Sequence, residues 1–145
     1  MPFTGSIENR LLIRELYDRY GDASWRGDRE DWANCFTKDG RWVSHLFDCR
    51  GRSELIKTWD DLWKDWSHVA FLYTLGSLEV SGDRATARSY AREIVQLKSG
   101  GLFKLAGRYD DELVRENGEW LFASRLYKIM IAEVPGEASA PQQKP

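Results

Sequence analysis

Hydrophobic side chains in the first third of the chain recur every three to four residues, which is the period of a helix with one buried face. Ser6 is placed to cap the first such helix, Leu16 lies on its apolar face, and Gly27 is placed to end it. Asp28 follows as the cap of a second, short helix that buries Trp32. The pattern therefore predicts two helices joined at a glycine.

A third helix is expected over residues 53–66, with Ser53 as its cap and a charged, solvated outer face. Between the second and third helices, the Asp-Gly pair at residues 39–40 indicates a turn. Residues 41–47 then read as a strand and residues 49–52 as a loop. One strand is therefore expected between these two helices.

From about residue 68 the pattern changes from helical to alternating, which is typical of strands. Glycine-containing turn signals cut this region into four predicted strands. They span residues 70–81, 84–98, 102–115 and 119–132. Turns this short join antiparallel strands, and strands this long should curl. The predicted fold class is α+β, with three N-terminal helices packed on the concave face of a strongly curved antiparallel sheet, so that a cone encloses a cavity.

The length of 145 residues suits one domain with a substantial core. We assign that domain to residues 1–134 and expect a disordered tail over residues 135–145, where the sequence is small, polar and proline-containing. The last strand is apolar on both faces, with Phe122 on one side and Tyr127 on the other. Because such a sheet must bury both faces, we expect a homodimer or higher homo-oligomer that covers the convex side.

The composition argues against some classes of binding partner. Lys and Arg total 21 against 23 for Asp and Glu, so the formal charge of -2 gives no electrostatic reason to expect nucleic acid or an anionic membrane. Two cysteines and no apolar signal segment favour a reduced, cytoplasmic protein. Seven Trp and six Tyr either fill the core or line an aromatic cavity, and the sequence leaves both explanations open.

Several short motifs carry a resemblance to a known family through their order and spacing. They are Arg26-Gly27-Asp28, residues 36–40 (FTKDG), Gly51-Arg52, residues 78–90 (LEVSGDRATARSY), residues 107–111 (GRYDD) and residues 118–120 (GEW). Over about residues 7–134 the chain resembles the SnoaL-like branch of the NTF2-like superfamily. The resemblance implies an NTF2-like cone, a fold that hosts dehydratases, isomerases, cyclases, hydrolases and binding modules.

Relatives with scytalone-dehydratase-like or dehydrochlorinase-like chemistry pair an Asp at a helix end with a His on a strand. In this chain Trp25 stands where the resemblance would place the Asp, and Gly76 or Ala70 stands where it would place the His. Asp22, one turn before Trp25, and His68, at the start of a strand, are the nearest chemical substitutes. We therefore expect His68 to act as base or acid and Asp22 to orient it.

Both assignments have a structural alternative. His68 could lie in a loop against neighbouring tryptophans, and Asp22 could form a salt bridge with an arginine of the sheet. Further side chains are predicted to contact substrate, the Arg groups by binding a carboxylate or phenolate and the Tyr groups through their hydroxyls. The predicted substrate-binding residues are Tyr20, Trp25, Trp42, His45, Tyr73, Tyr90, Arg92, Tyr109 and Arg125.

The function expected on these grounds is a cofactor-independent enzyme, a dehydratase, isomerase, cyclase or other lyase, that acts by proton transfer on a small hydrophobic, aromatic or polycyclic molecule. Two isolated His residues do not supply a three-ligand metal site, and no phosphate-binding loop, dinucleotide fingerprint or nucleophile elbow occurs, so neither metal nor cofactor is expected. One alternative is a non-catalytic ligand-binding or assembly module, since the usual Asp and His are replaced. Another is a subunit of a larger oxygenase.

Overall fold

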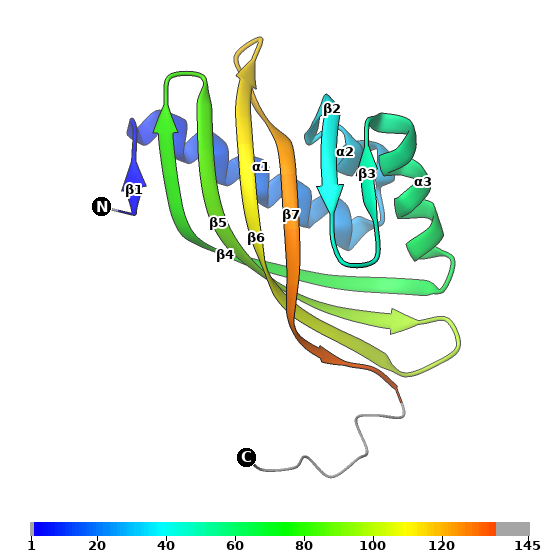
Figure 1. Ribbon diagram of the computed structural model, residues 1–145. Coiled ribbons are helices and arrows are strands. Elements are labelled where there is room, and N and C mark those ends of the chain that lie inside the picture. The colour runs from blue at the N-terminus through cyan, green and yellow to red at the C-terminus, as the bar shows by residue number, and fades with distance from the viewer. Residues whose placement is uncertain (1, 136–145) are drawn as a thin grey trace.

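The computed structural model describes residues 2–135. Within them a seven-stranded sheet has the order β1-β4-β5-β6-β7-β2-β3 (Figure 1). The elements are β1 (Phe3–Thr4), α1 (Ile7–Arg26), α2 (Arg29–Ala33), β2 (Phe36–Val43), β3 (Asp48–Arg50), α3 (Arg52–Trp63), β4 (Trp66–Ser81), β5 (Arg84–Leu97), β6 (Leu102–Glu116) and β7 (Glu119–Glu133). Apart from Pro135, the tail predicted over residues 135–145 lies outside the described residues.

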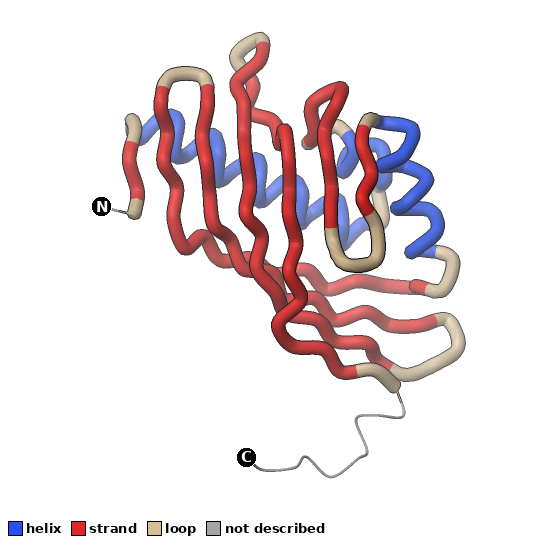
Figure 2. The backbone as a smooth tube through the Cα atoms, in the orientation of Figure 1, coloured by secondary structure: helices blue, strands red, loops and turns tan. Residues whose placement is uncertain are grey.

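The sheet bends strongly, and α1 crosses its concave side (Figures 1 and 2). Strands β4 to β7 form the predicted antiparallel meander, while α2 and α3 lie beside β2 and β3 at one end of the sheet. The predicted α+β fold, with three helices on a curved, mostly antiparallel sheet, is confirmed. Two parallel pairings, β1 with β4 and β2 with β7, were not expected from the sequence. No helix within residues 2–135 is both long and apolar enough to cross a bilayer.

The first helix begins and ends where the sequence places it, and the second begins where expected but ends at Ala33, before Cys35 and Phe36, which the helical pattern places on its buried face. The Ser6 hydroxyl oxygen accepts a hydrogen bond from the Asn9 N–H at 3.1 Å, and Gly27 ends α1. The Asp28 carboxylate accepts from the Asp31 N–H at 3.0 Å and so caps α2. Each cap satisfies a backbone donor that has no partner within its helix.

The third helix corrects the prediction, because Ser53 is not its cap and its last residue is Trp63, three residues before the expected end. The helix is capped by Gly51, whose φ of 84° is favourable for glycine, and no side chain caps it. The Glu54 side chain instead accepts a hydrogen bond from the Arg50 N–H at 2.7 Å. Trp66 already belongs to β4, so the sheet takes over the residues assigned to the last turn.

The region before α3 also differs from the prediction. Asp39 and Gly40 form no turn but lie within β2, where the register with β7 shifts between Phe36 and Arg41. Of the segment predicted as a loop at residues 49–52, the first two residues belong to β3, which pairs antiparallel with β2, and the last begins α3. A polar Asp-Gly pair therefore marks an irregular stretch of strand here instead of a chain reversal.

β-Bulges in β4 and β7 change which side chains face the core. In β7 the register with β6 shifts at Ala123, so Phe122 and Arg125 both point inward although their parities differ. A similar shift at Gly76 changes the inward parity of β4. The prediction that Phe122 and Tyr127 lie on opposite faces is therefore wrong, because the extra residue reverses the alternation and both face inward.

Candidate functional site

A cavity of about 90 Å³ lies between the helices and the concave face of the bent sheet. Every helix and strands β2 and β4 to β7 contribute to its wall, together with the loop between β2 and β3. The wall is mainly aromatic, as the tryptophan and tyrosine content allowed. The aromatic lining residues are Tyr20, Trp32, Trp42, Phe47, Trp59, Trp63, Trp66, Phe71, Phe103, Tyr109 and Tyr127. The others are Ser24, Ser44, Leu46, Leu62, Val69, Glu93, Leu105 and Ile129.

Glu93 brings a carboxyl group into this aromatic wall. It lies on β5 between Phe71 of β4 and Leu105 of β6, and it shares the inward face with its strand neighbours Ala91 and Val95. The side chain is half-buried. Within residues 2–135 it forms neither a hydrogen bond nor an ion pair. Because buried carboxyl groups normally have partners, this one is a candidate for chemistry with a ligand.

The surroundings of Glu93 in the wall shift the pKa of its carboxyl toward neutral pH. Burial raises the pKa of the Glu93 carboxyl to about 7, and the nearby Arg125 guanidinium opposes that rise. The phenols of Tyr20, Tyr109 and Tyr127 are its other titratable neighbours. A carboxyl with a pKa of about 7 is present in both protonation states at neutral pH, which is the property of an efficient general acid or base.

Tyr127 supplies a second polar group without a partner. Its hydroxyl is buried and finds no hydrogen-bond partner among the described residues. The ring stacks on Tyr109 with centroids 4.4 Å apart, and it lies so close to Gly107 that a Cβ there would approach a ring carbon to 2.5 Å. Burial raises the pKa of the Tyr127 phenol. It therefore stays protonated and can donate a hydrogen bond to a ligand.

An ion pair lies beneath the aromatic wall. The Arg125 guanidinium donates to both carboxylate oxygens of Asp111, at 2.8 and 3.1 Å, and both side chains are almost fully buried. Asp111 also accepts from the Tyr17 hydroxyl at 2.5 Å and from the Ser89 hydroxyl at 3.1 Å. The Arg125 Cζ lies 3.8 Å from the Tyr109 ring centroid. The Asp111 carboxylate is thus satisfied within the protein, and the pair supports the wall from behind.

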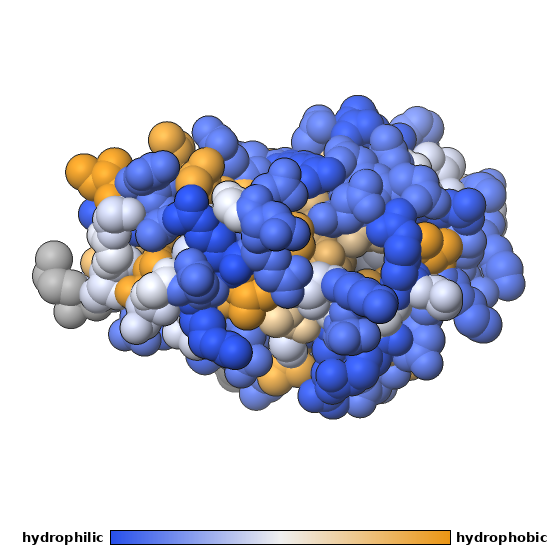
Figure 3. All heavy atoms as spheres, turned by 90° about the horizontal axis from the view of Figure 1, so that it is seen from above, coloured by the Kyte–Doolittle hydropathy of each residue, from blue (hydrophilic) through white to orange (hydrophobic). Residues whose placement is uncertain are grey.

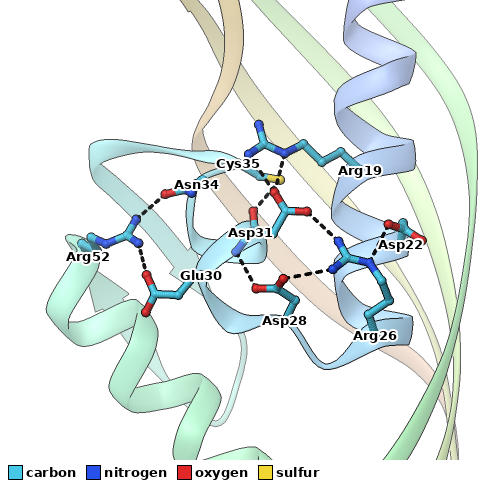
Figure 4. A network of polar contacts seen from close by, with 9 residues as sticks. All are labelled: Arg19, Asp22, Arg26, Asp28, Glu30, Asp31, Asn34, Cys35 and Arg52. Atoms are coloured by element: carbon cyan, nitrogen blue, oxygen red, sulfur yellow. Dashed lines mark hydrogen bonds and ion pairs between the residues drawn. The ribbon is translucent and has the colours of Figure 1, made fainter.

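The structure does not bring the expected catalytic pair into the cavity. The Asp22 carboxylate is exposed on α1 and forms an ion pair with Arg26 at 2.8 Å, within a surface network that includes Asp31 (Figure 4). His68 is exposed on β4, adjacent to the inward-facing Val69, so alternation turns it to the convex side. Neither residue lines the cavity. The alternative given for Asp22, a salt bridge with an arginine of the sheet, is also not found, because its partner is Arg26 of the same helix.

Three of the predicted substrate-binding residues, Tyr20, Trp42 and Tyr109, line the cavity, whereas the others lie elsewhere. Trp25 is 53% exposed, and its indole N–H donates to the Phe71 carbonyl at 2.9 Å. His45 is exposed in the loop that covers the cavity. The remaining four are placed as follows: the Tyr73 hydroxyl donates to Asp18 at 2.6 Å, Tyr90 and Arg92 are exposed on the convex face, and Arg125 lies behind the wall.

Sequence reasoning missed Glu93, although β5 contains a signal for it. Alternate positions from residue 85 to residue 95 read Ala, Ala, Ser, Ala, Glu and Val, and the residues between them include Arg88 and Arg92. A single acid within a stripe of small and apolar side chains indicates an inward-facing carboxyl. The other parity carries the solvated and convex-face side chains, which is where Tyr90 and Arg92 are found.

The described residues offer no cluster of three or more His, Cys, Asp or Glu side chains that could hold a metal ion. Cys35 and Cys49 are free and buried, and burial raises the pKa of the Cys35 thiol to about 12. The surface is largely hydrophilic in the view of Figure 3, with hydrophobic residues visible among the hydrophilic ones. Glu93 and Tyr127 each bring into the cavity wall a polar group that has no partner among the described residues.

Comparison with known proteins agrees with this architecture. A model of the SnoaL-like domain matches residues 5–126. A candidate scytalone dehydratase from Novosphingobium aromaticivorans DSM 12444 is similar in structure, with a TM-score of 0.82, 20% identity, and coverage of 88% of this chain and 87% of that protein. A hexachlorocyclohexane dehydrochlorinase, LinA type 2, has a TM-score of 0.80 and 20% identity over 94% of this chain and 95% of its own.

A third similar structure is a variant of Rv3472 from Mycobacterium tuberculosis, described as a protein of unknown function. It is 28% identical over 94% of this chain and 84% of its own, with a TM-score of 0.77. No curated protein sequence matches the chain. The structural likenesses to the first two of these proteins establish a shared fold, and the family model covers most of the sequence. The chain belongs to the family of SnoaL-like domains, within the NTF2-like superfamily.

Proposed function

We propose that the protein is a cofactor-independent lyase or isomerase that moves a proton at a carbon atom of a small hydrophobic substrate, with Glu93 as the base. One observation carries this proposal. A carboxyl group with a pKa of about 7 lies unpartnered in an aromatic cavity. The relatives support the reaction class, because a dehydratase and a dehydrochlorinase both remove a proton and a leaving group from neighbouring atoms.

In this mechanism the ionised Glu93 carboxylate takes the proton of a C–H bond. The electron pair of that bond becomes the new double bond, while the leaving group departs with its own bonding pair or a carbonyl oxygen takes up the charge as an enolate. The Tyr127 hydroxyl can donate a hydrogen bond to that oxygen or leaving group. Protonated Glu93 then returns its proton to the product or to water. The aromatic wall limits the access of water to the reacting atoms.

Turnover by Glu93→Gln tests the role of the carboxyl. Loss of chloride from hexachlorocyclohexane and deuterium uptake from D2O into aryl ketones report proton removal from carbon. Glu93→Gln should lower these rates by about 10² to 10⁴ fold, because it removes the base. In the wild type the rate should rise with pH through about 7, where Glu93 ionises.

Asp22→Ala and His68→Ala serve as controls, since both side chains lie outside the cavity and should leave the rates unchanged. Normal rates for Glu93→Gln, or loss of rate in the His68 variant, would contradict the assignment. Absence of proton exchange in every compound would favour the second candidate, a ligand-binding module. That candidate is supported by Trp25, which stands in place of the usual helix-end acid and lies outside the cavity lining.

We also propose that a second copy of the chain covers the convex face. Leu72, Tyr90 and Met130 are exposed there and border a shallow groove across β4 to β7. Because exposed apolar patches of this kind usually mark interfaces, light scattering at micromolar concentration should give the mass of a dimer or higher oligomer. Leu72→Glu should reduce that mass to that of the monomer, and a monomeric wild type would reject the proposal.

A further inference from the structure

We propose that the cavity binds a ligand that carries a positively charged amine, held by the Glu93 carboxylate and by the faces of the surrounding tryptophan rings. This inference rests on the proposed function and names the substrate class of the same site, a small hydrophobic molecule with one ammonium group that takes one oxygen of the Glu93 carboxylate and leaves the other to act as the base. It stands on the charge of the wall, on the ring faces that form it, and on the missing partner of Glu93.

The charge of the wall favours a cation. Among the described residues that line the cavity, Glu93 alone is an acid or base other than a tyrosine, and no lysine, arginine or histidine belongs to the lining. The nearest cation, Arg125, lies outside the lining and is paired with Asp111, so it offsets the charge of Glu93 only in part. An anionic ligand would therefore meet a carboxylate with no cation in the lining to compensate it, whereas an ammonium group would complete an ion pair.

The ring faces add a second attraction. Trp59 stacks on Trp63 with centroids 5.1 Å apart, and Trp63 is tilted against Trp66 at 5.9 Å, so the tryptophans form a continuous part of the wall. The face of an aromatic ring carries negative potential and attracts cations, most strongly in tryptophan. The protein already places a cation on such rings, since the Arg125 Cζ lies 4.4 Å from the Tyr20 centroid and closer still to Tyr109.

The polar groups of the wall that lack a hydrogen-bond partner could both be bound by an amine. A protonated amine has N–H donors for the Glu93 carboxylate, which has none from the described residues. The neighbouring Tyr127 hydroxyl has no partner either, and its oxygen can accept a further N–H. A ligand with an apolar ring and an ammonium group would thus satisfy both polar atoms and fill the apolar space.

Three probes of nearly equal shape test the inference: benzylamine, benzyl alcohol and benzoate. Quenching of tryptophan fluorescence measures their binding at neutral pH. The wild type should bind benzylamine about tenfold or more tightly than benzyl alcohol, and benzoate most weakly. In Glu93→Gln the preference for the amine should fall to within about twofold, because the carboxylate is gone. Equal binding of amine and alcohol by the wild type, or a preference that persists in Glu93→Gln, would overturn the inference.

A second measurement uses the wild type alone and so does not depend on how Glu93→Gln folds. Because an ammonium group stabilises the ionised carboxyl, benzylamine should lower the pKa of Glu93 and release protons when it binds just below pH 7. Calorimetry in two buffers of different ionisation enthalpy measures that release. No release with benzylamine, or an equal release with benzyl alcohol, would reject the ammonium ligand. If Glu93→Gln still abolished proton transfer from carbon, the proposed function would stand while this inference failed.

Discussion

Two carboxyl groups on the concave face of one sheet have opposite surroundings. Asp111 receives hydrogen bonds from Arg125, Tyr17 and Ser89 and is 2% exposed. Glu93, on the adjacent strand, is half-buried in an aromatic wall and receives none within residues 2–135. The fold therefore neutralises one of these two inward carboxyl groups and leaves the other to be neutralised by a proton or by a ligand.

The difference separates a structural charge from a functional one. A buried carboxylate that is fully hydrogen-bonded and paired with a cation holds its elements in place. Removal of one partner leaves the other charge buried without compensation, which strongly destabilises the folded state. A carboxyl without partners instead lowers the stability of the folded state whenever it ionises, so the fold gains nothing from it. We attribute its presence in the cavity to the proposed ligand or reaction.

The largest expected effect comes from removing Asp111, the carboxyl group that is hydrogen-bonded within the protein. Asp111→Ala leaves the guanidinium of Arg125 buried without its partner, and it should lower the free energy of unfolding by about 3–5 kcal/mol. Urea denaturation followed by circular dichroism measures the loss. Asp110→Ala is the matched control, because that exposed neighbour pairs with Arg108 on the surface and should cost less than about 1 kcal/mol. Equal losses in the two variants would contradict the contrast between the two carboxyl groups.

A pH-dependent effect of intermediate size on the free energy of unfolding should come from Glu93, the carboxyl group without a partner among the described residues. The pKa of Glu93 is about 7 in the folded protein against 4.5 for the free side chain, so the folded state holds this proton more tightly. The free energy of unfolding should therefore fall by about 3 kcal/mol as the pH rises from about 4.5 to 7 and change no further from this group above that.

Glu93→Gln removes this titration. The variant should match the wild type near pH 4.5 and exceed its stability at pH 8 by as much as about 3 kcal/mol. Denaturation curves of both proteins at several pH values give the difference, which cancels the contributions of the other titrating groups. Parallel stability profiles would show that Glu93 has a partner or free access to water. A variant less stable at pH 8 would contradict the prediction outright.

The parts of the fold that depend on local sequence could be predicted. Ser6 and Asp28 cap their helices, and the pair Asn117-Gly118 adopts the positive φ angles, 51° and 79°, of a tight hairpin turn. The parallel pairing of β2 with β7 could not be predicted, because it joins segments far apart in the chain. The bulge at Ala123 was also missed, since one extra residue reverses the inward face without any strong local signal.

The site was less predictable than the fold. Alternation along β5 places Glu93 on the opposite face from Arg92, but the sequence does not say which of the two faces is concave. The choice of Asp22 and His68 followed their nearness to the positions that relatives use, and three-dimensional proximity did not follow from it. An acid in a stripe of small residues is a physical signal, because only a cavity or a partner makes such a carboxyl tolerable.

The smallest effects come from a matched pair of tyrosines, of which Tyr17 contacts Asp111 and Tyr127 lies near Glu93. Tyr17→Phe removes the hydroxyl that donates to Asp111 at 2.5 Å, and it should lower the free energy of unfolding by about 2 kcal/mol, since the acceptor is charged and buried. Tyr127→Phe removes a buried hydroxyl with no partner among the described residues, so stability should change by less than about 0.5 kcal/mol or rise. Thermal and urea denaturation of both variants measure the contrast. A cost for Tyr127→Phe as large as that for Tyr17→Phe would mean that the Tyr127 hydroxyl is already satisfied in the folded protein, and the cavity would then lose the second polar group offered to a ligand.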